Sequence, residues 1–155
     1  MKKIIFLLLT LSCCFSGFAQ GKFFEECENI PNVTTVYVSH AMMKMVSGSL
    51  SGVNSPINLS GMARKIDSLV IVNGETPEAA RKVEALAGDN YSTAKGYELL
   101  MKVTESDSKM RIVYKSIGKE LYEYVLVVNE PNEASYIIIT GSLTPEDVQT
   151  YSKKR

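Results

Sequence analysis

The sequence predicts an α+β fold: a mixed, mainly antiparallel sheet with a four-stranded carboxyl-terminal meander, packed against helices. Two observations support this prediction. Four strand-like segments between residues 98 and 140 are joined by short polar turns, and such turns make neighbouring strands antiparallel. Before them, two strand-like segments alternate with helical ones, and a further helix follows the meander.

The first 19 residues have the pattern of an export signal. Lys2 and Lys3 precede the apolar run Ile4–Leu11, which is too short to span a bilayer. Gly17 and Ala19 then place small residues at the two positions that a signal peptidase reads. We therefore expect cleavage after Ala19 and export to the periplasm or the cell surface. No later segment is long and apolar enough to be a transmembrane helix.

A lipid anchor at Cys13 or Cys14 is the less favoured alternative. A lipoprotein cysteine follows a leucine three positions back and a small residue directly before it. Cys14 has Leu11 but is preceded by Cys13, and Cys13 has Ser12 but Thr10 in place of the leucine. Each match lacks one residue, so we expect a protein without a lipid anchor.

Removal of the signal leaves 136 residues, the size of one domain. We expect a leader at 20–32, a single domain at 33–152 and a basic tail at 153–155. The net charge of this mature part is −2, with the two signs interspersed, which excludes the concentrated basic face that nucleic acids require. It retains one cysteine, Cys27, so it forms no internal disulfide; we expect that thiol to be half-buried.

The elements before the meander follow from local composition. The β-branched and aromatic residues at 33–38 predict a strand, and 41–46 is rich in helix-forming residues. A Gly/Ser-rich loop at 47–56 separates these from helical spacing at 59–66. The apolar residues at 68–72 predict the second strand.

Two helix starts share one design, Thr76-Pro77-Glu78 and Thr144-Pro145-Glu146. In each, threonine caps free amide groups, proline occupies the first helical position and glutamate meets the positive end of the helix dipole. We expect the first helix to end at Gly88, and the second to run to about Tyr151 before the basic tail.

The meander strands are predicted at 98–104, 110–115, 121–128 and 134–140. The last two are apolar almost throughout, which indicates central strands covered on both faces. The alternation in the first two suggests a face toward the helices made of Leu99, Met101, Val103, Met110, Ile112 and Tyr114.

The opposite face of the meander is our candidate partner-binding surface. It would present Leu100, Val113, Val125 and Val127, surrounded by Glu98, Lys102, Arg111, Lys115 and Glu123. An apolar centre within a charged rim is typical of a recognition surface. The alternative is that the last helix crosses and covers this face. The composition of the face also depends on the register of the strand at 121–128, since a slip of one residue would replace Val125 with Tyr124 or Leu126.

Five segments resemble the bacterial family known as domain of unknown function 4252: VTTVYVSHAMMKM, IDSLVIVNGE, YELLMKVTESDSKMRIVYK, EYVLVVNE and YIIITGSL. The similarity runs from Val33 to the last helix. It implies a small exported protein of the Gram-negative envelope with no established activity, and it identifies no catalytic residues. The family pattern more often has lysine at the position of His40.

The segment HAMMKM, residues 40–45, combines the only histidine with three methionines. Copper(I) binds methionine sulfur and histidine nitrogen, so His40, Met42 and Met45 are an alternative metal site. On a helix, however, Met42, Met45 and Val46 share one face, and such a group is ordinary core packing. We favour the core interpretation and predict no metal or cofactor.

The sequence favours a protein that is not an enzyme. One histidine and no identifiable carboxylate partner leave no serine triad, and no glycine-rich loop has phosphate-binding spacing. Thiol chemistry at Cys27 with His40 is the low-ranked alternative. We expect a protein- or ligand-binding module with a regulatory or stress-related role, whose partner is an envelope protein or a second copy. The alternative is a small-molecule or lipid carrier with an apolar pocket between sheet and helices.

We predict that the mature protein begins at Gln20, because the small residues Gly17 and Ala19 follow the apolar run at the spacing of a cleavage site. Intact-mass measurement of the exported protein tests this prediction. A species that begins at an acylated Cys13 or Cys14 would contradict it.

Overall fold

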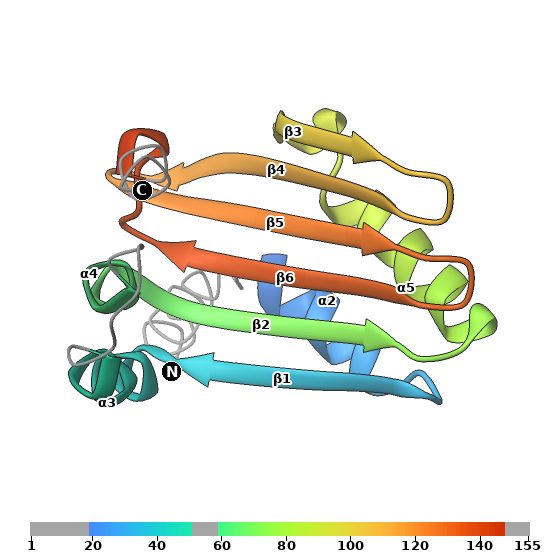
Figure 1. Cartoon of the computed structure of the whole chain (residues 1–155), viewed down its shortest axis with the longest axis horizontal. Coiled ribbons are helices and arrows are strands. Elements are labelled where there is room, and N and C mark those ends of the chain that lie inside the picture. The colour runs from blue at the N-terminus through green and yellow to red at the C-terminus, as the bar shows by residue number, and fades with distance from the viewer. Residues whose placement is uncertain (1–18, 51–58, 148–155) are drawn as a thin grey trace, which may run out of the picture.

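Six antiparallel strands form one open sheet in the order β1-β2-β6-β5-β4-β3 (Figure 1). The structure is a computed structural model that describes residues 19–50 and 59–147. Its strands are β1 (Val33–Ser39), β2 (Ile66–Gly74), β3 (Glu98–Thr104), β4 (Lys109–Gly118), β5 (Leu121–Asn129) and β6 (Ala134–Gly141). Its helices are α2 (Ala19–Glu28), α3 (His40–Leu50), α4 (Leu59–Arg64), α5 (Pro77–Asn90) and the short 3₁₀ helix η2 (Thr93–Lys95). The predicted α+β fold is therefore confirmed.

Strands β6 and β5 lie at the centre of the sheet, as their apolar composition predicted. The chain leaves β2, crosses through α5 to the far edge at β3, and returns strand by strand until β6 pairs with β2. The helices α2 and α5 lie together behind the sheet in Figure 1. They cover one face; among the described helices, α3 and α4 lie against the other face at one end only.

The main core lies between the sheet and the helices α2 and α5. Its largest fully buried side chains are Tyr91, Tyr136, Phe23, Ile138, Val70, Val72, Val83, Val125, Val127 and Cys27. Each buried aliphatic or aromatic side chain of this size contributes about 1.5–3 kcal/mol relative to exposure. The rings of Phe23, Tyr91 and Tyr136 meet edge to face, with Phe23 centroids 5.1 Å from Tyr91 and 6.1 Å from Tyr136. These contacts fix α2 against the sheet.

Helix α2 corrects our expectation of a leader at 20–32. The segment is part of the folded domain because Phe23 and Cys27, four residues apart on one helix face, are both fully buried. Glu25 and Glu28 are exposed on the helix surface. The thiol of Cys27, which we expected to be half-buried, lies inside the core.

Helix α5 begins as predicted but ends later. The hydroxyl of Thr76 accepts a hydrogen bond from the amide of Ala79 at 3.2 Å, and proline occupies the first turn. The helix passes through Gly88 without a left-handed turn and ends at Asn90; the amide of the buried Tyr91 donates the last helical hydrogen bond to the carbonyl of Ala87. The predicted stop at Gly88 was therefore wrong.

The faces of β4 and β5 are the reverse of our prediction, whereas Leu99 on β3 pairs with Val113 and keeps its predicted face. Val113, Val125 and Val127 lie in the core under α2 and α5. The physical reason is register: Val125 pairs with Ile138, whose neighbour on β2 is Val70, so all three side chains share the face that the helices cover. Leu100 is exposed, at 44%, beside an irregularity in β3.

A second, smaller cluster lies on the opposite face at the end where α3 and α4 sit. It consists of Met43, Ala63, Ile66, Tyr124 and Leu143. Gly141 permits this end to close, because a Cβ there would stand 2.0 Å from the carbonyl oxygen of Lys65. The amide of Ser142 also donates to that carbonyl at 2.8 Å.

The last predicted helix is described only in its first turn. The hydroxyl of Thr144 accepts from the amide of Asp147 at 3.1 Å, and Asp147 accepts from the amide of Thr144 at 3.0 Å, which is a reciprocal cap. The predicted continuation to Tyr151, the basic tail, most of the loop at 47–56 and the signal with Cys13 and Cys14 lie outside the described residues. None of the described helices is long and apolar enough to cross a membrane.

Candidate functional site

One row of polar side chains crosses the helix-covered face of the sheet at its end near α4. Ser68 pairs with Thr140, and Thr140 pairs with Glu123. They are 8%, 5% and 4% exposed, and they are the buried polar residues among those that the structure describes. Glu123 pairs in turn with Lys115 on β4, so the row runs over four neighbouring strands. Buried polar groups in this alignment interrupt an otherwise apolar face and mark a candidate site.

Glu123 is the charged centre of this row. Its carboxylate accepts hydrogen bonds from the hydroxyls of Tyr97 and Thr140. Burial raises the pKa of Glu123 above its ordinary value, although Tyr97, Lys115 and Thr140 each act in the opposite direction. The pKa of Tyr97 is also raised, by burial and then by the neighbouring Glu123. Each of the two groups therefore releases its proton at a higher pH than an exposed group of the same kind.

Lys115 closes the network on the side of β3. Its ammonium donates to the carbonyl of Lys95 at 2.6 Å and stands 5.4 Å from the centroid of the Tyr97 ring. Gly96, with φ of 85°, adopts the left-handed conformation that brings η2 back to this point. The short helix thus holds Tyr97 and Lys115 beside the buried carboxylate.

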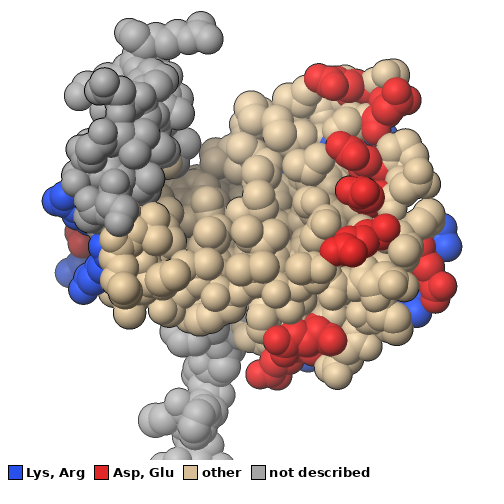
Figure 2. Space-filling model, turned by 60° about the horizontal axis from the view of Figure 1, so that its bottom comes forward, with Lys and Arg blue, Asp and Glu red and all other residues tan. Residues whose placement is uncertain are grey.

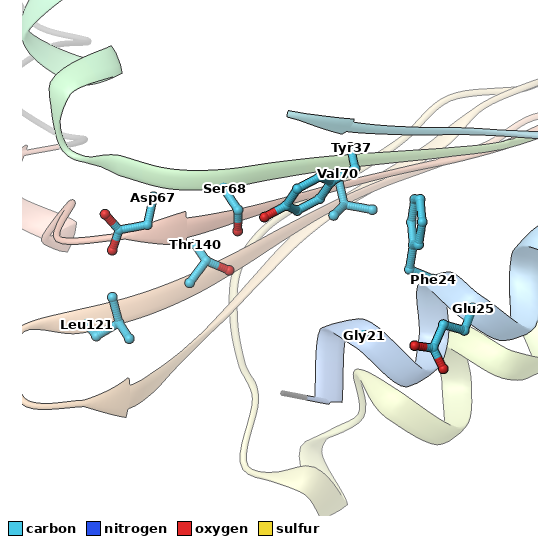
Figure 3. Close-up of a pocket in the computed structure, with 9 residues that line it drawn as sticks. All are labelled: Gly21, Phe24, Glu25, Tyr37, Asp67, Ser68, Val70, Leu121 and Thr140. Carbon is cyan, nitrogen blue, oxygen red and sulfur yellow. The ribbon is translucent and has the colours of Figure 1, made fainter. Parts of the chain in front are cut away.

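A cavity of about 530 Å³ lies above the other end of the row, between α2 and the sheet (Figure 3). It is lined by Gly21, Phe24, Glu25, Tyr37, Asp67, Ser68, Val70, Leu121 and Thr140. The carbon-rich lining comes from Phe24, Tyr37, Val70 and Leu121, and the hydroxyls come from Ser68 and Thr140. We call this space the α2 cavity.

The walls of the α2 cavity come from the first turns of α2 on one side and from the sheet on the other. Figure 3 shows Phe24, on the helix, across from Tyr37 and Val70 on the strands, with the hydroxyls of Ser68 and Thr140 further along the sheet. The rings of Phe24 and Tyr37 are 6.3 Å apart, centroid to centroid, and define one wall. Gly21, one helical turn before Glu25, has no side chain to fill the space. The carboxylates of Glu25 and Asp67 make the lining acidic.

The buried methionine of the HAMMKM segment is not one of those that we predicted. Met43 is buried against α4, whereas Met42 and Met45 are 51% and 72% exposed. The predicted core role of Met42 and Met45 was therefore wrong. The reason is that α3 meets α4 and the end of β2 with the face that carries Met43, a contact that periodicity alone does not indicate.

His40 follows the last residue of β1 and contacts the start of β2. Its Nδ1 lies 3.1 Å from the carbonyl oxygen of Ile66 and 3.3 Å from Oδ1 of Asp67. The imidazole thus contacts the backbone and the side chain at the junction of the two strands. Among residues 19–50 and 59–147, no group of three or more histidine, cysteine or acidic side chains is arranged to hold a metal ion.

Cys27 and His40 occupy separate environments. The thiol lies in the main core, where burial and then Glu26 raise its pKa to about 12. A thiol in that state is a poor nucleophile, because the reactive form is the thiolate. His40 is held at the other end of β1 by Ile66 and Asp67. The geometry gives no support to thiol chemistry that uses both.

Sequence reasoning missed the polar row and the α2 cavity. Ser68, Glu123 and Thr140 each adjoin two buried apolar residues of the same parity in their strands. That anomaly was visible in each strand separately. Only the register of β2, β6 and β5 shows that the three are neighbours.

The described residues form an α+β fold with an open six-stranded sheet and a partly open cavity beside its first described helix. The chain belongs to the family described as domain of unknown function (DUF4252), whose model matches residues 24–151. The match covers α2 from Phe24 onward and all six strands. It confirms the resemblance drawn from the sequence. No curated protein matches the chain. No solved structure matches it either.

We predict that Glu123→Gln stabilises the protein at neutral pH more than at acidic pH. The folded state raises the pKa of Glu123 above 4.5, so it binds the proton more strongly than the unfolded state does. That contribution to stability is complete below pH 4.5 and declines as the pH rises through the folded pKa. Urea unfolding from pH 4 to pH 8 should therefore show a growing advantage for the glutamine variant. Glu133→Gln, at an exposed turn, should show none. A Glu123→Gln difference that is constant with pH would contradict the prediction.

Proposed function

We propose that the protein is an exported, non-enzymatic binding module that holds a small amphipathic molecule in the α2 cavity. The proposal rests above all on one observation: an apolar-walled cavity stands over the buried polar row of the sheet. Its volume of about 530 Å³ lies in the range of about 300–1,000 Å³ that is common for small-molecule sites.

The lining suits a ligand with an apolar body and a polar group at one end. Phe24, Tyr37 and Val70 offer aromatic and aliphatic surface for an apolar body. At one end of the cavity the hydroxyl oxygen of Thr140, whose hydrogen is donated to Glu123, can accept a hydrogen bond from a polar group of the ligand, and Ser68 adds a second polar side chain there. A few polar groups in a mostly apolar cavity fix the orientation of a ligand.

The charges favour an uncharged or cationic ligand. Glu25 and Asp67 line the cavity, and Glu123 lies behind Thr140. An anionic molecule, such as a fatty acid, would meet these carboxylates and lose the hydration of its own charge. This consideration favours a module for a small neutral or basic molecule over a carrier of anionic lipids.

The cellular role is the broader part of the proposal. Export is supported by the signal pattern of residues 1–19, and it would place the module in the periplasm or on the surface of a Gram-negative cell. A regulatory or stress-related role is compatible with a domain that binds a small molecule and carries no identified catalytic group. The second candidate, attachment to an envelope protein, is favoured by the open sheet face opposite α2.

We predict that the uncharged probe N-phenyl-1-naphthylamine binds with increased fluorescence, and that Gly21→Trp weakens this binding at least tenfold. The new indole would extend from the wall of the α2 cavity, where Gly21 leaves open space. Gly88→Trp is the matched control, because Gly88 is also an exposed helical glycine with open space around it but lies on α5. Fluorescence titration of protein recovered after expression of the full chain provides the measurement.

The anionic probe 1-anilinonaphthalene-8-sulfonate should bind more weakly than the uncharged probe, because of the acidic lining. The chain contains no tryptophan, so the introduced indole also reports whether the probe is close to position 21 or to position 88. Equal binding of the uncharged probe to both glycine variants, or no binding to the parent, would refute the proposal.

A further inference from the structure

The strand β1 is an unprotected edge of the sheet. Its sequence, VTTVYVS, contains no charge, proline or glycine, and it pairs with β2 in an unbroken register from Val33 to Ser39. In the part of the chain that the structure describes, no strand pairs with its outer side. Natural sheets usually protect such an edge with charges, proline or a bulge, because its free backbone groups can pair with another strand.

The opposite edge, β3, has that protection. It carries Glu98 and Lys102, and its pairing with β4 is interrupted between Leu99 and Met101. The surface toward β1 differs: Figure 2, with the bottom of Figure 1 turned forward, shows a broad uncharged area, and acidic side chains gather to its right. Val36 and Tyr37 on β1 are 41% and 59% exposed. The two edges of one sheet are thus built differently.

We propose that two copies of the chain pair through β1, antiparallel and about a two-fold axis at Val36, to form one continuous twelve-stranded sheet. In this register Val36 opposes its own copy, Thr34 opposes Val38, and Thr35 opposes Tyr37. Every opposed pair then lies on the same face of the sheet, and no charge is brought against another. A strand that fits its own copy in this way gives a closed, isologous interface.

The register of the sheet supports a second copy over an unrelated strand. On the face opposite α2, one apolar row runs through all six strands: Val36, Ile71, Ile137, Leu126, Ile112 and Met101. Pairing centred on Val36 joins this row to the same row of the second copy, end to end. A shift by two residues would place the row of one copy beside Thr34 or Val38 of the other.

The inference is independent of ligand binding, although the two sites are neighbours. Tyr37 lines the α2 cavity and would oppose Thr35 of the second copy. One pair of seven-residue strands is a small interface, so we expect a dimer of modest affinity that forms with rising concentration. If the protein forms no dimer, the titration with the uncharged probe still tests the cavity.

Cysteine cross-linking tests the pairing and its register. Directly opposed residues of antiparallel strands have Cα atoms about 4.5–5.5 Å apart, within the range that a disulfide spans. Val36→Cys should therefore form a covalent dimer on mild oxidation. Thr34→Cys and Val38→Cys should not cross-link alone, since each residue would lie about 13 Å from its own copy. An equimolar mixture of those two variants should cross-link.

The unsubstituted protein measures the background, because its Cys27 is buried. Sedimentation velocity provides a second measurement without cysteine chemistry. Val36→Lys should shift the parent's dimer to monomer, because it places two like charges on the axis, while Leu100→Lys, exposed on the other edge, should not. A parent that is monomeric at all concentrations, a Val36→Lys dimer, or cross-linking of Thr34→Cys alone at the rate of Val36→Cys would overturn the proposal.

Discussion

Three central strands place one block of apolar side chains beneath α2 and α5, and this burial determines the direction of the side chains in the other strands. Val70 on β2, Ile138 on β6 and Val125 on β5 are neighbours in register, and all are buried. Since successive residues of a strand point to opposite faces, these contacts assign both faces of the sheet. Helix α2 covers the same apolar side chains, and its Phe23 and Cys27 belong to this core.

The candidate site follows from the same register. Two residues along each strand from this apolar block, the next side chain that points toward the helices is polar. These side chains are Ser68, Thr140 and Glu123. At this point α2 begins, and the sheet and the first turn of the helix leave the cavity between them. Burial beside this cavity raises the pKa of Glu123, and Tyr97 and Thr140 supply the hydrogen bonds that a buried carboxylate requires. Position in the register thus explains both the polarity and the location of the site.

Local signals in the sequence predicted much of the fold. The β-branched strands, the short turns and the cap at Thr76 depend on neighbouring residues, and the structure contains all of them. Local signals could not predict which residues of β5 face the helices, because the residues on both faces of this strand are largely apolar. Helix α2 was missed, although the spacing of Phe23 and Cys27 is that of a buried helix face. The polar row is a long-range feature that joins β2, β6 and β5, so no single segment reveals it.

The sidedness of β5 is the central claim, and a pair of adjacent aspartate substitutions tests it most directly. Val125 is fully buried under the helices, whereas Leu126 lies half-buried on the open face. Val125→Asp should abolish the cooperative unfolding transition, because it places an unpaired charge in the core. Leu126→Asp should retain that transition, because its carboxylate reaches solvent. Circular dichroism during urea unfolding provides the measurement, and a folded Val125→Asp beside an unfolded Leu126→Asp would contradict the account.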